Sequence, residues 1–316
     1  MIKARGLTKH YGDKVALDGV SFSIKPGVVT GFLGPNGAGK STSMRLMVGL
    51  DKPTSGTVTI GGKKLAEHAS PMHVVGALLD AKGVHPGRTA RSHLRGLAAT
   101  HGIGNKRVEE VLGMTGLADV AGKRVGGFSL GMGQRLGIAA ALLADPEVLI
   151  LDEPVNGLDP DGVIWVRNLV RAQAAEGKTV LLSSHLMSEM AQTADHVIVL
   201  GRGRLVANAP IGDLLAGGAP RVRVGSPDAA RLVRELRSAS VLGTLTGVNP
   251  DDVAIDIQSD ETFVIRGLQA ASIGYLCARD GITLHELTPI KDSLEEAYMH
   301  LTRDDIEYQT GGLAHV

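Results

Sequence analysis

The chain has 316 residues, more than one hydrophobic core usually spans, so its length predicts two domains. Hydrophobic residues make up 43%, and no apolar run approaches the ~20 residues of a membrane-spanning helix, which predicts a soluble chain that meets a membrane only through a partner. Aromatic residues are only 3% and the 33 basic side chains equal the 33 acidic ones, which argues against a nucleic-acid surface. The single cysteine, Cys277, cannot form a disulfide within the chain and is predicted to be a small buried side chain.

The first 210 residues alternate strand-like and helix-like segments, which predicts an α/β domain around a largely parallel sheet. The expected strands are residues 15–24, 28–33, 57–60, 73–79, 147–151, 179–184 and 196–200. The expected helices are residues 40–49, 89–99, 105–114, 131–144, 161–175 and 186–193. The run Val148–Leu151 has no polar face, as expected for a central parallel strand.

The alternation breaks at residues 217–220, GGAP, which are expected to form a linker. A small α+β domain is expected over residues 221–305, with strands and helices at residues 221–225, 227–237, 253–257, 263–267, 269–279 and 282–287. Ser293 and Glu296 have the spacing of a capping box, and the helix after them is expected to place Leu294, Ala297, Tyr298 and Leu301 on one face. The tail of residues 306–316 is expected to be disordered.

Residues 31–46, GFLGPNGAGKSTSMRL, contain the pattern G-x-x-x-x-G-K-[ST] of a phosphate-binding loop, between a predicted strand and a predicted helix. Such a high density of glycines suggests that another group approaches the backbone too closely for side chains to fit. Backbone N–H groups turned inward can surround an anion. Lys40 would reach the outer phosphates, and Ser41 would place its hydroxyl on Mg²⁺.

A second stretch, EVLILDEP at residues 147–154, is an apolar strand that ends in two carboxylates. Asp152 can hold Mg²⁺ beside the Ser41 hydroxyl. Glu153 can face the γ-phosphate and act as the base for an attacking water. The alternative, a pair of solvated acids that close a strand, is less favoured beside a phosphate loop.

Further motifs follow in the order found in the ATP-binding subunits of ABC (ATP-binding cassette) transporters, which the chain resembles over about residues 2 to 210. GPNGAGKST at 34–42 resembles the Walker A motif, LILDEP the Walker B motif, NGLDP at 156–160 the D-loop and SSH at 183–185 the switch loop. The resemblance implies an ABC cassette at residues 1–216, with a mixed sheet and a helical subdomain at about 85–145.

The resemblance also implies the roles of particular residues. The implied catalytic residues are Lys40, Glu153 as the base and His185 as a contact of the γ-phosphate. Tyr11, expected on an early edge strand, would stack on adenine, although packing alone could explain it. The implied ATP-binding residues are Tyr11, Gly34, Pro35, Asn36, Gly37, Ala38, Gly39, Lys40, Ser41, Thr42, Ser129, Gly131 and Asp159.

FSLGMGQR at residues 128–135 resembles the family's signature motif, in which a helix start meets the nucleotide held by the other subunit. One chain has one phosphate loop and one signature, so two complete sites need a second cassette, and a homodimer is the simplest source. The usual signature is LSGGQ. Here Leu130 replaces a glycine and Met132 replaces the glutamine, although Gln134 follows, so contacts from the glutamine side chain are in doubt.

The family's Q-loop glutamine is also missing, and VVGALLDAKGVHP places Asp80 at that position. A carboxylate can bind Mg²⁺, so Asp80 joins Ser41 and Asp152 as a predicted metal ligand, and a surface acid is the alternative. No pair of histidines has metal-ligand spacing, and one cysteine cannot build a thiolate site.

The resemblance implies an ATPase subunit that dimerises on two MgATP and drives separate transmembrane permease subunits at the cytoplasmic face of the membrane. The altered signature and Q-loop and the small C-terminal domain look most like cassettes of drug and antibiotic-resistance exporters. The C-terminal domain would then be regulatory, dimer-stabilising or only a packing appendage. The alternatives are a soluble non-transport ABC-type ATPase and a cassette that exports a lipid, a polysaccharide or another substrate. A GTPase should show N-K-x-D, which is absent, and a kinase would need neither FSLGMGQR nor SSH.

Overall fold

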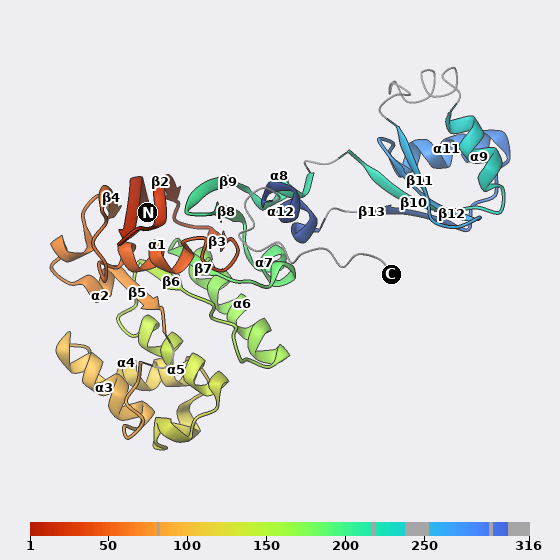
Figure 1. Ribbon diagram of the computed structural model, residues 1–316. Helices are drawn as coiled ribbons and strands as arrows, with labels where there is room; N and C mark the ends of the chain where they lie inside the picture. Colours follow the sequence, from red (N-terminus) through yellow and green to blue (C-terminus); the bar gives the residue numbers. More distant parts are fainter. Residues whose placement is uncertain (81–82, 217–218, 238–252, 291–292, 303–316) are drawn as a thin grey trace, which may run out of the picture. The chain divides into compact units, whose positions relative to one another are not determined.

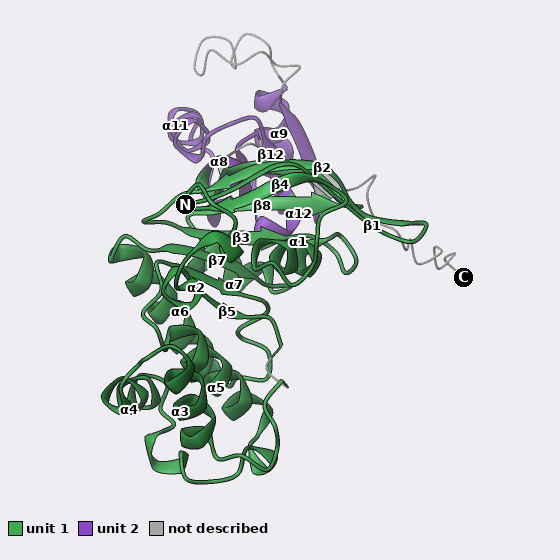
Figure 2. Cartoon of the chain, turned by 90° about the vertical axis from the view of Figure 1, so that its left-hand side faces the viewer, with its two compact units in different colours: residues 1–212, 298–316 green, residues 213–297 purple. Residues whose placement is uncertain are grey.

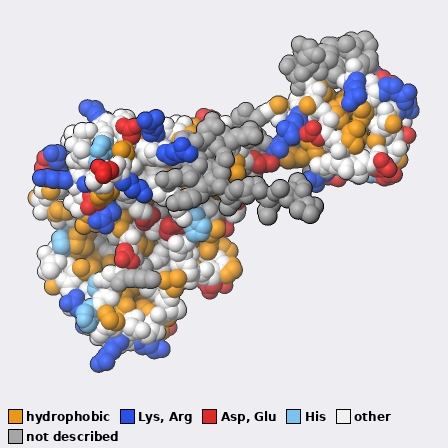
Figure 3. Space-filling model, viewed as in Figure 1, with side chains coloured by type: hydrophobic (Ala, Val, Ile, Leu, Met, Phe, Trp, Pro, Cys, Tyr) orange, Lys and Arg blue, Asp and Glu red, His pale blue; other side chains and the backbone are white. Residues whose placement is uncertain are grey.

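The computed structural model describes residues 1–80, 83–216, 219–237, 253–290 and 293–302 (Figure 1). The chain divides into two compact units, residues 1–212 with those after 297, and residues 213–297 (Figure 2). No helix in the described ranges has both the length and the apolar character that crossing a bilayer requires. Both basic and acidic side chains are present on the visible face of the first unit (Figure 3).

Six strands of the first unit form a mixed sheet in the order β5-β6-β7-β3-β8-β9. They are β3 (Val29–Leu33), β5 (Val75–Leu78), β6 (Val148–Leu151), β7 (Thr179–Ser183), β8 (His196–Gly201) and β9 (Arg204–Pro210). Neighbours from β5 to β8 pair in parallel, and β9 runs antiparallel to β8. Every residue of β3, β6 and β7 is buried, which confirms the predicted parallel core and the interior place of the apolar run in β6.

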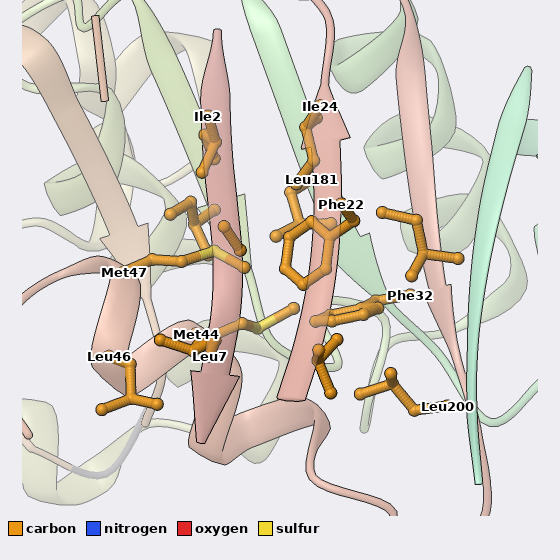
Figure 4. Packing of buried hydrophobic residues seen from close by; sticks show 14 of the residues in the cluster. Ile2, Leu7, Phe22, Ile24, Phe32, Met44, Leu46, Met47, Leu181 and Leu200 are labelled. Atoms are coloured by element: carbon orange, nitrogen blue, oxygen red, sulfur yellow. The ribbon is translucent and has the colours of Figure 1, made fainter. Parts of the chain in front are cut away.

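A second, antiparallel sheet has the order β2-β1-β4, with β1 (Ile2–Tyr11), β2 (Lys14–Ile24) and β4 (Ser55–Ile60). The expected placing of Tyr11 on an edge strand is wrong, because β1 is the central strand and pairs on both sides. The main core lies between the two sheets, where side chains of α1 (Lys40–Met47) meet those of both (Figure 4). In it the rings of Phe22 and Phe32 meet edge to face, with their centroids 5.6 Å apart.

The remaining helices before residue 217 are α2 (Pro71–Val74), α3 (Ala90–Thr100), α4 (Asn105–Met114), α5 (Leu130–Leu142), α6 (Pro160–Ala175), α7 (Met187–Thr193) and α8 (Ile211–Ala216). Helices α3, α4 and α5 pack against one another and form a helical region of the first unit (Figures 1 and 2). Helix α6 reaches this region through Trp165, whose indole N–H donates to the carbonyl of Met114 at 3.2 Å. The guanidinium of Arg135 on α5 lies 4.6 Å from the Trp165 ring centroid.

Two predicted strands differ from the observed ones. Residues 73–79 were expected to be one strand, but Pro71 begins a helical turn and the strand covers only Val75–Leu78. Residues 282–287 were expected to be a strand, but β13 is Glu286–Ile290. Gly281 ends the preceding helix, residues 270–280, in the left-handed conformation, and the N–H of Ile282 donates to the carbonyl of Cys277. These residues therefore cap the C-terminus of that helix instead of beginning a strand.

The second unit contains β10 (Arg221–Gly225), α9 (Ala229–Leu236), β11 (Ala254–Ile257), β12 (Thr262–Arg266), α11 (Ala270–Asp280), β13 and the first residues of α12 (Leu294–Thr302). Its antiparallel sheet has the order β11-β12-β10-β13, which together with the two helices is a ferredoxin-like arrangement and confirms the predicted α+β class. Cys277 is buried in its core, as predicted.

The capping box at the start of α12 is confirmed, since Ser293 and Glu296 exchange two hydrogen bonds of 3.1 Å between side chain and backbone. The predicted linker at residues 217–220 lies partly outside the described residues, and the tail of residues 306–316 lies wholly outside them. Both remain predictions.

Candidate functional site

The loop of residues 34–39 connects β3 to α1, and the phosphate-binding motif continues into the first turn of the helix. Two glycines of the loop are required by the protein itself. A Cβ on Gly34, whose φ is 152°, would lie 2.5 Å from the carbonyl oxygen of Leu200. A Cβ on Gly39, whose φ is 104°, would lie 2.6 Å from Leu17 Cδ2. The loop is therefore held closely against neighbouring strands before any ligand arrives, and ligand approach is not the only reason for its glycines.

Lys40 is the buried cation of this loop, with only 8% of its surface exposed. Its Nζ donates to the carbonyl oxygens of Gly34 at 2.6 Å and Pro35 at 3.2 Å. Burial lowers the pKa of Lys40 from its ordinary value, and the nearby charges of Glu153 and Asp152 oppose that shift. The ammonium is thus stabilised by carbonyls of its own loop and by the two acids at the end of β6.

A cavity of about 700 Å³ opens at this loop, a volume within the usual range for small-molecule sites. Several separately predicted site residues line it: Tyr11, Pro35, Asn36, Gly37, Ala38, Gly39, Lys40, Ser41, Thr42, Asp80, Asp152 and Glu153. They come from the end of β1, the phosphate loop, and the ends of β5 and β6. The carboxyl ends of parallel strands meet at one edge of a sheet, which is why distant motifs converge there.

The two acids after β6 are held by Ser183 at the end of the neighbouring strand β7. The Ser183 hydroxyl donates to Oδ1 of Asp152 and accepts the backbone N–H of Glu153 at 2.9 Å. Glu153 has a φ of 50°, a left-handed conformation that is uncommon outside glycine. Ser183 is fully buried, so its hydroxyl holds the Asp152 carboxylate and the Glu153 backbone out of contact with water.

His185 also faces Glu153. Its Nδ1 lies 2.8 Å from Oε2 of Glu153, and its backbone N–H donates to the same oxygen at 3.4 Å. An ionised carboxylate can only accept, so Nδ1 carries a hydrogen in this pair. The Glu153 side chain is 24% exposed and that of His185 56% exposed, which leaves both within reach of solvent.

We expect Ser183→Ala to lower both stability and ATP turnover. The change leaves the Glu153 N–H without its buried acceptor, which costs about 1–3 kcal/mol of unfolding free energy. Urea unfolding and a steady-state ATPase assay measure the two effects. Ser188→Ala, an exposed serine on α7, is the control and should change neither quantity. A Ser183→Ala protein with unaltered unfolding and turnover would contradict this role.

Four predicted ATP-binding residues do not line the cavity: Gly34, Ser129, Gly131 and Asp159. Gly34 begins the phosphate loop, and its carbonyl oxygen accepts from Lys40 Nζ. Ser129 caps α5, and its hydroxyl accepts the N–H of Met132 at 3.2 Å. Asp159 caps α6 in the same way, through the N–H of Gly162 at 2.9 Å. Gly131 lies against the D-loop, where a Cβ would be 2.8 Å from the carbonyl oxygen of Gly157. Their contacts with a nucleotide stay a prediction.

The structure adds residues that the motifs did not single out for this site. Gln134, only 5% exposed, lines the cavity and donates from Nε2 to the carbonyl of Glu153 at 2.7 Å. Lys14, Leu79, Leu130 and Asn156 also belong to the lining. A sequence signal existed for Gln134, because a long polar side chain in the mostly apolar helix α5 usually has a buried partner.

Comparisons with known proteins agree with this geometry. A family model described as "ABC transporter" matches residues 17–156, and one described as "AAA domain, putative AbiEii toxin, Type IV TA system" matches residues 123–191. A domain family of unknown function matches residues 220–295.

Two curated relatives are informative. The chain is 43% identical to "Bacitracin transport ATP-binding protein BcrA" of Bacillus licheniformis over 217 residues, which are 68% of this chain and 71% of the relative. It is 34% identical to "Daunorubicin resistance ATP-binding protein DrrA3" of Streptomyces coeruleorubidus over 317 residues, which are 96% of each chain. The second match therefore extends over the C-terminal unit as well.

Among solved structures, the chain resembles "Dimeric Structure of MJ0796, a Bacterial ABC Transporter Cassette" with a TM-score of 0.62 and 28% identity, over 67% of this chain and 99% of that one. It resembles the same cassette "bound to ADP and Pi" with a TM-score of 0.61 and 26% identity, over the same shares. The motifs, the cavity and these matches lead to one conclusion: the chain belongs to the family of ABC transporter ATP-binding proteins and is an ATPase subunit of that kind.

Proposed function

We propose that this subunit binds and hydrolyses MgATP to power a membrane exporter of the drug or antibiotic type. The observation that supports ATP chemistry best is the single cavity that joins the phosphate loop, the buried Lys40 and the acids Asp152 and Glu153. The names of the relatives, one concerned with bacitracin transport and one with daunorubicin resistance, support export of such compounds.

In this proposal the loop's N–H groups and the Lys40 ammonium bind the β- and γ-phosphates, and the Lys40 bonds to loop carbonyls give way to phosphate oxygens. Ser41, Asp152 and Asp80 offer the hard oxygen donors that fit Mg²⁺, which usually takes one or two carboxylates together with phosphate and water. Bound Mg²⁺ would neutralise part of the phosphate charge.

Glu153 is the proposed general base. Ser183 and Gln134 hold its backbone, His185 contacts its carboxylate, and that carboxylate takes a proton from the water that attacks the γ-phosphate. His185, held by Glu153 through Nδ1, can donate from Nε2 to a phosphate oxygen when its ring is protonated. Tyr11, which lines the same cavity, stacks on the adenine.

The assembly is proposed to be a homodimer of cassettes on two nucleotides, bound to separate permease subunits at the cytoplasmic face of the membrane. Ser129 and Gly131 lie outside the chain's own cavity lining, as residues that serve a partner's nucleotide would. The dimeric form of the similar cassette MJ0796 supports the same arrangement.

Co-purification tests the transport part of the proposal. We expect the tagged protein, expressed in its own cells and extracted in mild detergent, to bring down an integral membrane protein together with ATPase activity. Mass spectrometry identifies that partner, and Lys40→Ala protein serves as the activity control. Recovery of a stable ATPase with no integral membrane partner would favour a non-transport ATPase instead.

A further inference from the structure

Tyr11, the residue proposed to stack on adenine, is held at two points. Its hydroxyl donates to Oδ2 of Asp51 at 2.6 Å, and the Lys9 ammonium lies 4.7 Å from its ring centroid. Lys9 is itself anchored, because Nζ donates to the carbonyl of Lys52 at 2.8 Å. The Tyr11 side chain nevertheless stays 46% exposed and lines the cavity, so the ring is oriented and still accessible.

Asp51 links this ring to the phosphate loop. It accepts from Nε of Arg45 at 2.8 Å on one oxygen and from Nη2 at 3.2 Å on the other, a bidentate pair. Arg45 lies on α1, the helix that begins at Lys40 in the loop. Hydrogen bonds from Arg45 and Tyr11 lower the pKa of Asp51 to about 2, so the carboxylate is ionised and accepts both donors at neutral pH.

We propose that Asp51 is a positioning residue for the nucleotide base: it holds the Tyr11 ring at a set distance from the phosphate loop, so that one nucleotide fits both. The proposal rests on ATP binding in the proposed function. Neither Asp51 nor Arg45 lines the cavity, so Asp51 acts through Tyr11 and not by contact with the ligand.

The physical effect is preorganisation. Without the carboxylate, the Tyr11 side chain regains rotational freedom, which nucleotide binding must then remove. The loss should appear only for ligands that have a base, because the phosphates bind the loop and not the ring. Inorganic tripolyphosphate, which has the phosphates alone, is therefore the discriminating probe.

The experiment measures the Kd of ATP and of tripolyphosphate by calorimetry, with Mg²⁺, for the full chain and four variants. Asp51→Ala should weaken ATP binding about 3- to 10-fold and leave tripolyphosphate binding unchanged. Tyr11→Phe, which keeps the ring and removes the hydroxyl, should give a loss of the same size. The double variant Asp51→Ala/Tyr11→Phe should lose no more than either single change, because both remove the same bond.

Asp13→Ala is the matched control, since it removes an exposed acid two residues after Tyr11 that does not line the cavity. Equal losses for ATP and tripolyphosphate would overturn the proposal, because Asp51 would then act on the loop through Arg45. Unchanged ATP affinity in Asp51→Ala would overturn it as well. Should Asp51→Ala fold poorly by urea unfolding, Tyr11→Phe alone is the test, because it removes the same hydrogen bond and keeps the Arg45–Asp51 ion pair, with the same selective loss expected. Failure of the proposed function is distinct: the unaltered chain would then bind neither ligand.

Discussion

Replacing Glu153 by Gln should abolish steady ATP turnover and leave ATP binding intact. A general base typically contributes about 10²–10⁴-fold to a rate, so turnover should fall by that factor. The amide is nearly the same size, and the backbone bonds from Glu153 to Ser183 and Gln134 do not involve the side chain. The nucleotide should therefore remain bound, and an ATP-bound dimer should accumulate on a sizing column.

Glu147→Gln provides the matched control. Glu147 is an exposed acid directly before β6, at the opposite end of that strand from Glu153, and it does not line the cavity. Its turnover and its elution on the sizing column should equal those of the unaltered protein. Normal turnover in Glu153→Gln would show that another group takes the proton from water.

Lys40→Ala should remove nucleotide binding. Hydrogen bonds from a charged donor contribute about 1.5–3 kcal/mol each, and the loss of two to phosphate would weaken ATP binding by roughly 100-fold or more. Calorimetric titration with ATP measures this directly. The carbonyl oxygens of Gly34 and Pro35 would lose the hydrogen bonds that they accept from Lys40. The unfolding free energy should therefore fall by about 1 kcal/mol as well.

Lys25→Ala is the control for Lys40→Ala, because Lys25 is an exposed lysine in the turn after β2 and outside the cavity lining. Circular dichroism should show folded protein for both variants. If folded Lys40→Ala bound ATP as tightly as the unaltered chain, the assignment of residues 34–42 to phosphate binding would be wrong.

Local patterns in the sequence were sufficient for the centre of the fold. The phosphate loop is recognisable because its pattern spans eight residues between an apolar strand and a helix. The run in β6 is recognisable because a strand buried on both faces has no polar alternation. In both cases the structural requirement applies to residues that are consecutive in the chain, so their types are sufficient to predict the structure.

Contacts between distant residues could not be predicted in this way. Tyr11 and Asp51 are 40 residues apart, and Ser183 and Asp152 are 31 apart. The sequence shows an acid after α1 and a serine at the end of β7, but only the order of strands in the sheet brings each to its partner. The two sheets and their registers are tertiary results, and no local period encodes them.

The roles of residues that can either cap a helix or contact a ligand were also ambiguous in the sequence. Ser129 and Asp159 were expected from resemblance to touch nucleotide, and within one chain their side chains cap α5 and α6. A hydroxyl or carboxylate at a helix start can satisfy a backbone N–H or meet a ligand, and the sequence does not distinguish the two. The strand in residues 282–287 was misplaced for a similar reason, since the alternating residues after Gly281 serve the end of α11 instead.

The indole of Trp165 is an intrinsic fluorescence probe of the cassette. It is the only tryptophan in the chain, and it extends from α6 to the helical region, against the Arg135 guanidinium and the Met114 carbonyl. Fluorescence excited at the red edge of protein absorbance comes from this one residue. A rotation of the helical region would move the Arg135 guanidinium relative to the ring and so change the fluorescence. Subdomain motion can thus be followed without attached dyes, and the four-stranded C-terminal unit is spectroscopically silent in the same measurement.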